Sequence, residues 1–162
     1  MKHLLLTTIA AVVLVGCGES SSLEADKALL HSGAGKGSIE AAENAIAAGA
    51  NVNYIDLYGY TPLHVAVNRG DKIMTELLID NGADLDAKDS KLHAESPLFH
   101  ALNASHIEIT QLLIDRGAGV NVRNNKGLTP LDRVLEWNDS ALANLLRKHG
   151  GKTGEELKAE GK

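Results

Sequence analysis

The chain has 162 residues, of which 44% are hydrophobic and only 3% aromatic, and its formal net charge is −5 at pH 7. This length suffices for one domain, and with so few aromatic rings, leucine, isoleucine and small residues would have to fill the interior. A mildly acidic chain without a lysine and arginine cluster argues against nucleic acid or anionic lipid as the main partner.

The first residues have the pattern of an export signal. A basic start, Met1-Lys2-His3, precedes a twelve-residue, mainly apolar run over residues 4–15. This run is too short for a membrane span, which needs about 20 residues, and it is typical of a secretory signal peptide. Residues 14–17 (LVGC) resemble the bacterial lipobox, whose cysteine is lipidated and becomes the mature N-terminus. The alternatives are an ordinary signal peptide with an incidental cysteine, or an uncleaved anchor.

The cysteine content supports lipidation of Cys17. Cys17 is the only cysteine in the chain, so an intramolecular disulfide is impossible. We therefore expect a signal peptide over residues 1–16 and a polar tether over 17–23 that carries the lipidated Cys17. Gly18 replaces the aspartate that often retains such lipoproteins at the inner membrane, which favours an outer-membrane lipoprotein facing the periplasm.

A Gly-Ala pair recurs at a nearly fixed period through the rest of the chain. It occurs at residues 49–50, 82–83 and 117–118, with Gly150-Gly151 in the next place, so the steps are 33, 35 and 33 residues. A period near 33 indicates one supersecondary unit repeated, in which stacked neighbours stabilise one another. Such arrays present an extended binding surface, and the period requires no active site.

Within each period, two helices are expected. Residues 61–66 (TPLHVA), 96–101 (SPLFHA) and 129–134 (TPLDRV) each predict a helix start, with threonine or serine as the cap and proline in the first turn. A polar turn and a second helix with a leucine-rich stripe follow, as at residues 77–79 and 112–114. The glycine of each Gly-Ala pair then stands where a helix end favours a left-handed residue.

These residues match the ankyrin repeat, most completely at 56–66 and 77–84. The resemblance implies an all-α solenoid of four helix-turn-helix repeats with β-hairpin-like fingers and a concave face. The repeats would span residues 24–55, 56–88, 89–123 and 124–151, followed by a charged tail over 152–162. The third repeat has two extra residues and Ala94 in place of the finger glycine, and the fourth has Asp132 for the motif histidine. The chain resembles small bacterial ankyrin-repeat lipoproteins.

The scarce aromatic residues are the first candidates for partner contacts. Tyr58 and Tyr60 flank the finger glycine of the second repeat, with Ile55 and Leu57 in the same segment, and Trp137 follows the first helix of the fourth repeat. Tyrosine and tryptophan are enriched at binding hot spots. The alternative is packing, with Tyr54 and Phe99 between repeats and Trp137 over the open end of the array. For Tyr58 and Tyr60 the sequence favours contact over packing.

The longer finger of the third repeat is the second candidate. It places Lys88, Lys91, Leu92, His93 and Glu95 at a tip with extra reach, although a tolerated surface insertion would look the same. Weaker candidates complete the expected concave face: Asn68, Arg69, Asn103, Arg123, Asn125 and Lys126.

Catalytic and metal-binding patterns are absent from the sequence. His31 and His64 occupy the same place in successive repeats, which the ankyrin pattern uses for a structural hydrogen bond, and His100 and His106 do not have a ligand spacing. We therefore expect no enzyme, cofactor or metal, but a monomeric protein-binding module in the envelope. An immunity-type inhibitor of a secreted toxin or lipase, or a protective partner of a periplasmic enzyme, are the alternatives.

Overall fold

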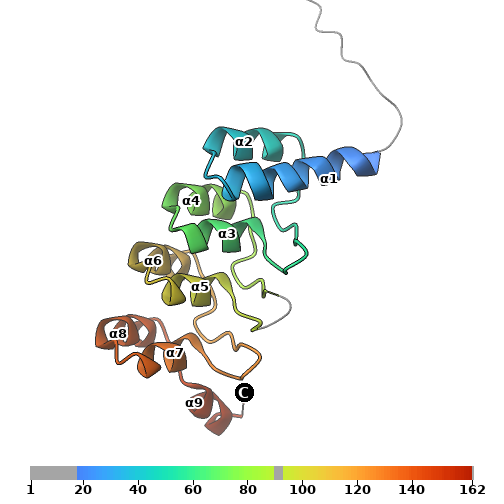
Figure 1. The fold of residues 1–162 in the computed structure, drawn as a ribbon. Helices are drawn as coiled ribbons and strands as arrows, with labels where there is room; N and C mark the ends of the chain where they lie inside the picture. The colour runs from blue at the N-terminus through green and yellow to red at the C-terminus, as the bar shows by residue number, and fades with distance from the viewer. Residues whose placement is uncertain (1–17, 90–92, 162) are drawn as a thin grey trace, which may run out of the picture.

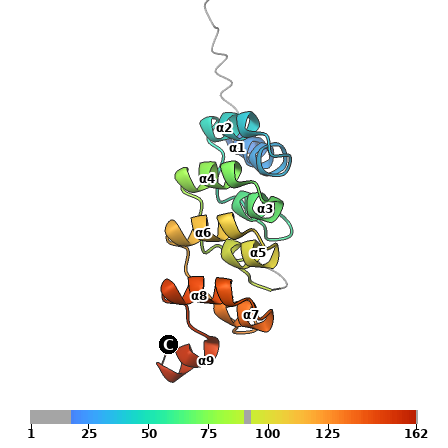
Figure 2. The ribbon, with the colours of Figure 1, turned by 90° about the vertical axis from the view of Figure 1, so that its left-hand side faces the viewer.

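The computed structural model describes residues 18–89 and 93–161, and there the chain forms two layers of stacked helices (Figures 1 and 2). One layer, which we call the inner layer, holds α1, α3, α5 and α7, and the other, the outer layer, holds α2, α4, α6 and α8. The elements in chain order are α1 (Gly18–Ala28), the π-helix η1 (Leu29–Ala34), α2 (Ile39–Ala47), α3 (Pro62–Arg69), α4 (Lys72–Asp80), α5 (Pro97–Asn103), α6 (Ile107–Asp115), α7 (Pro130–Glu136), α8 (Ser140–Lys148) and α9 (Gly154–Ala159). The described ranges contain no strand, and no helix in them is long and apolar enough to cross a membrane.

The inner helices begin where the Thr-Pro pairs predict. Thr61 Oγ1 accepts a hydrogen bond from His64 N, and His64 Nδ1 accepts one from Thr61 N, which forms a complete capping box at α3. Thr129 and Asp132 form the equivalent box at α7. In the unit between them Ser96 takes the cap position, but its buried Oγ has no hydrogen-bond partner in the described structure. The expectation that serine caps α5 with its side chain is therefore wrong.

Equivalent leucines of successive units form one continuous core. Leu63, Leu98 and Leu131 are fully buried in the inner helices, as are their counterparts in the outer helices, Leu78, Leu113 and Leu146. Burial of each such side chain contributes about 2 kcal/mol. The core is therefore shared between neighbours, as the 33-residue period predicts.

Three turns project beside the inner layer, and we call them finger I (residues 55–60), finger II (88–95, described outside 90–92) and finger III (123–128). Each is closed by one backbone hydrogen bond of 3.0 Å, which Asp56, Asp89 and Asn124 donate to Tyr60, Glu95 and Leu128. They are turns rather than paired strands. In finger II the backbone of Ala94 has a φ of 52°, as the glycines of the other two fingers have positive φ. This conformation costs a non-glycine residue about 1 kcal/mol.

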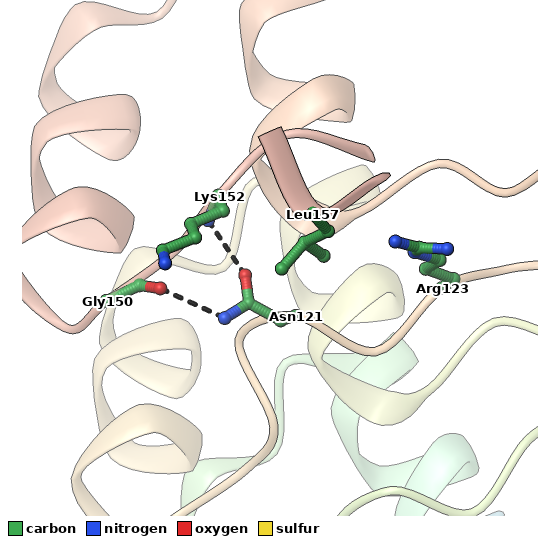
Figure 3. A pocket seen from close by; sticks show the side chains of 5 residues that line it. All are labelled: Asn121, Arg123, Gly150, Lys152 and Leu157. Atoms are coloured by element: carbon green, nitrogen blue, oxygen red, sulfur yellow. Dashed lines mark hydrogen bonds between the residues drawn. The ribbon is translucent and has the colours of Figure 1, made fainter. Parts of the chain in front are cut away.

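Asparagine side chains link the units at the base of the fingers. Asn121 Nδ2 donates to Gly150 O at 2.9 Å, and Lys152 N donates to Asn121 Oδ1 at 2.7 Å (Figure 3). Asn53 makes the same pair of bonds two repeats earlier, to Gly82 O and Asp84 N. Each asparagine amide thus satisfies one donor and one acceptor of the following unit and fixes the distance between neighbouring fingers.

Both ends of the array differ from the sequence-based expectation. Residues 18–23, expected as a flexible tether, are the first turns of α1. Extending an existing helix costs little, because each added residue gains a backbone hydrogen bond. Residues 154–159, expected within a charged tail, form α9, which Thr153 and Glu156 cap reciprocally. Leu157 of α9 is buried, so this segment closes the end of the core.

Asp132 explains why α9 docks. Its Oδ2 accepts hydrogen bonds from Thr129 N and from Gly154 N, both at 2.8 Å. A β-carbon at Gly154 would lie 2.8 Å from Gly127 O, so only glycine permits this approach. The aspartate that replaces the motif histidine therefore joins α7 to the closing helix.

Candidate protein-binding surface

The side chain of Asp56 stabilises the turn of finger I. Asp56 Oδ1 accepts hydrogen bonds from Tyr58 N and Tyr60 N, both at 2.8 Å, and Gly59 turns the chain with a φ of 91°. These bonds fix the backbone of the turn, and the side chains of Leu57 and Tyr58 within it are exposed.

Large apolar side chains on finger I face solvent. The exposed fractions are 53% for Ile55, 87% for Leu57 and 75% for Tyr58. Beside them a hollow of about 260 Å³ is lined by Lys27, Leu30, Tyr54, Asp56, Leu57 and Tyr58. The finger and its hollow form the most concentrated group of exposed large apolar side chains in the described part of the chain, and an apolar patch of this kind typically marks an interaction site.

Tyr60 is placed differently from Tyr58. It is half-buried, and its ring packs edge-on against His64 and His100, with centroids 5.9 and 5.6 Å apart. Burial, followed by the negative charges of Asp89 and other nearby carboxylates, raises the pKa of the Tyr60 phenol above its usual value. The ring of Tyr60 therefore supports the packing between units, and only its remaining exposed part is open to a partner.

The weaker candidates on α3 use their polar groups within the array. Asn68 Oδ1 lies 3.0 Å from His100 Nδ1, and Arg69 donates through Nη1 to Gly35 O at 2.9 Å. Trp137, at the C-terminal cap of α7, is 45% exposed, and Leu135, two residues earlier in the chain, is 43% exposed. It is thus accessible on the same layer as the fingers, but far along the chain from finger I.

Fingers II and III contact each other through polar groups. Lys88 Nζ donates to Arg123 O at 2.8 Å, and Asn125 N donates to His93 O at 2.9 Å. His93 is exposed, as are Asn125 and Lys126. Lys91 and Leu92, and the proposed lipid site Cys17, lie outside the described residues.

Glu95 corrects the sequence-based interpretation of finger II. It was expected at an exposed tip, but only 5% of it is exposed. Its carboxylate pairs with Arg133 Nη2 at 2.7 Å and accepts a bond from Asn103 Nδ2 at 2.8 Å. Asn124 contributes a longer bond of 3.4 Å. Asn103 thus positions Glu95, and its side-chain amide is already engaged.

A second buried pair lies next to Glu95. Asp89 Oδ2 is 3.1 Å from His100 Nε2, and Asp89 Oδ1 accepts from Glu95 N at 2.7 Å. His64, fully buried, lies with its ring centroid 5.1 Å from that of His100, and its Nε2 is 3.3 Å from Glu95 O. Burial, and then the neighbouring His100, lowers the pKa of His64 to about 4. The cluster fixes finger II on the units before and after it.

Comparison with known families agrees with this geometry. Residues 46–94 match the family model described as ankyrin repeats (many copies), and residues 94–125 match the model of the ankyrin repeat. Residues 46–125 are ankyrin repeats. No curated protein matches the chain. The predicted ankyrin solenoid is thereby confirmed. Ankyrin repeats are protein-interaction modules, typically without enzymatic activity, and they imply a protein partner.

In this ankyrin array the sequence did not predict the buried polar cluster of Asp89, Glu95, His100 and Arg133. Glu95 directly precedes the Ser-Pro pair, in the place that Tyr60 and Leu128 take in the neighbouring repeats. That position, rather than its charge, was the available signal for burial. Among the described residues no group of three or more histidine, cysteine, aspartate or glutamate side chains is arranged to hold a metal ion.

Proposed function

We propose that this ankyrin array is a protein-binding module, tethered to the outer membrane by a lipid on Cys17, and that finger I binds a periplasmic protein. The main observation that supports this proposal is the exposure of three neighbouring apolar side chains, Ile55, Leu57 and Tyr58. Leu57 is almost entirely in solvent, so it contributes little to the stability of the array. Burial of these side chains by a partner would remove apolar surface from water at about 25 cal/mol per Å².

The proposed anchor agrees with the position of α1. Helix α1 begins at Gly18, the residue after Cys17, so the array would stand close to the membrane surface without a long spacer. Several acyl chains on the cysteine would hold it there, because a single chain binds only marginally.

Replacing Leu57 and Tyr58 with alanine is expected to weaken binding of the partner more than tenfold. Both side chains are exposed, so the fold should be retained, while loss of two apolar anchors removes hot-spot contacts. The partner is first identified by a photoreactive residue placed at Tyr58 in cells, followed by mass spectrometry and a binding assay with the purified pair.

The matched control is the pair Ile73→Ala and Ile107→Ala on the outer helices. These isoleucines are 66% and 61% exposed, similar to the finger residues, but they lie on the opposite layer. They should leave affinity within twofold. Equal weakening by both pairs, or equal cross-linking from Ile107 and Tyr58, would remove finger I from the site.

Lipidation is tested independently of the partner. A fatty-acid probe should label the wild-type chain, and Cys17→Ser should abolish that label and release the chain from the outer-membrane fraction. Glu19→Ser, two residues away, is the control and should keep both label and location. A Cys17→Ser chain that remains labelled would exclude the cysteine as the lipid site.

A further inference from the structure

Equivalent positions at the start of the three fingers change from apolar to basic along the array. Ile55, Lys88 and Arg123 each follow the glycine of a Gly-Ala pair by six residues, counted from Gly49, Gly82 and Gly117. The bond from Lys88 Nζ to Arg123 O confirms that the last two are neighbours in space. Together with Leu57 and Tyr58, this row is apolar at finger I and basic at fingers II and III.

The acidic residues of finger II pair with side chains other than Lys88 and Arg123. Asp89 and Glu95 are buried, and they pair with His100 and Arg133. The exposed Asp86 accepts a bond from Gly119 N at 2.7 Å, at the base of the fingers. In a chain of net charge −5, Lys88 and Arg123 thus place two cations next to each other at this end of the row.

A hollow continues the basic end of the row. It has a volume of about 710 Å³ and lies between finger III and α9, lined by Asn121, Arg123, Gly150, Lys152 and Leu157. Figure 3 shows Leu157 between the two cationic side chains. Lys152 Nζ pairs with Glu160 of the same chain. Such an exposed pair is worth at most about 1 kcal/mol and is readily exchanged.

We infer that the partner presents an extended acidic segment, with one apolar anchor against finger I and carboxylates along Lys88 and Arg123 toward the hollow. This inference rests on the proposed function and names the chemistry of its partner. Packed elements are about 10 Å apart, so the row from Ile55 to Arg123 spans about 20 Å. An extended segment of about six residues covers that length.

Selection from a random twelve-residue peptide library, displayed against the detergent-solubilised full chain, tests this inference. Enriched peptides should combine an aromatic or aliphatic residue with two or more carboxylates within about six residues. Raising the salt from 50 to 300 mM should weaken the best peptide several-fold, because exposed charges are screened.

Paired charge reversals provide the decisive comparison. Lys88→Glu with Arg123→Glu should weaken the best peptide at least tenfold. Lys36→Glu with Lys148→Glu changes the net charge equally at exposed sites away from the fingers, and should leave affinity within twofold. Unfolding midpoints of both variants, measured in urea, show that each remains folded.

The outcomes separate this inference from the proposed function. Apolar peptides that depend on Leu57 and Tyr58 but not on Lys88 and Arg123 would overturn the acidic segment and leave finger I as the site. Failure to enrich any peptide would also overturn it. Equal or tighter binding to phosphatidylglycerol vesicles or to single-stranded DNA would overturn it too, since the cations would then bind anions without a protein segment.

Discussion

Replacing Arg133 with methionine is expected to lower the free energy of unfolding by about 3–5 kcal/mol at pH 7, because the Glu95 carboxylate would stay buried without its cation. The Glu95 side chain is 7% exposed and that of Arg133 is 19% exposed, with the charged atoms 2.7 Å apart. Asn103 would still donate to Glu95, but an amide does not compensate a buried negative charge. Urea unfolding followed by circular dichroism measures the loss.

Arg116→Met is the matched control. Arg116 pairs with Asp80 at 2.6 Å, a shorter distance, but their side chains are 37% and 62% exposed. Water screens such a pair, so its removal should cost less than about 1 kcal/mol. Equal effects of Arg133→Met and Arg116→Met would show that burial of Glu95 has no energetic consequence.

A second change at Glu95 separates charge burial from packing. Glu95→Gln removes the negative charge while keeping the shape of the side chain, so Arg133→Met with Glu95→Gln should recover a large part of the lost stability. The coupling energy from this double-mutant cycle should exceed about 1 kcal/mol, since the two residues are in direct contact. Simple additivity would assign the cost to lost packing of the arginine stem instead.

The sequence predicts the repeating part of the fold because its signals are local. Helix starts at Thr61 and Thr129, with Pro62 and Pro130 behind them, depend on contacts three residues apart. The leucine positions depend on helical periodicity alone. These features recur every 33 to 35 residues, so several copies support each one.

The remaining features depend on contacts between repeats. Glu95 and Arg133 are 38 residues apart in sequence, so the residues near Glu95 do not reveal the cation that pairs with it. Tyr60 is directed inward by the histidines of two successive repeats, whereas Tyr58, two residues earlier, is exposed. Finger I therefore lies where the sequence indicates. Only the structure shows that Tyr60 packs against the array while Tyr58 is exposed to solvent.

The stability of the array should fall as the pH decreases from about 6.5 to 4, by up to about 3 kcal/mol from His64 alone. The pKa of His64 is lowered from 6.5 to about 4 in the folded state, first by burial and then by His100. Between these values the unfolded chain binds the proton and the folded chain does not, so acid favours unfolding. Above pH 6.5 the contribution of His64 to the pH dependence vanishes.

His64→Gln identifies this contribution. The variant cannot take up the proton, so its unfolding free energy should change less between pH 6.5 and 5 than that of the wild type, although it starts lower because the capping box with Thr61 is impaired. His93→Gln, at an exposed position, should keep the wild-type slope. Measurement above pH 5 keeps most carboxylates ionised. Loss of the cap alone would lower the unfolding free energy equally at every pH. A smaller slope of unfolding free energy against pH in His64→Gln, together with a His64 ring signal that does not titrate above pH 5 by NMR, would therefore attribute the acid sensitivity to this buried ring.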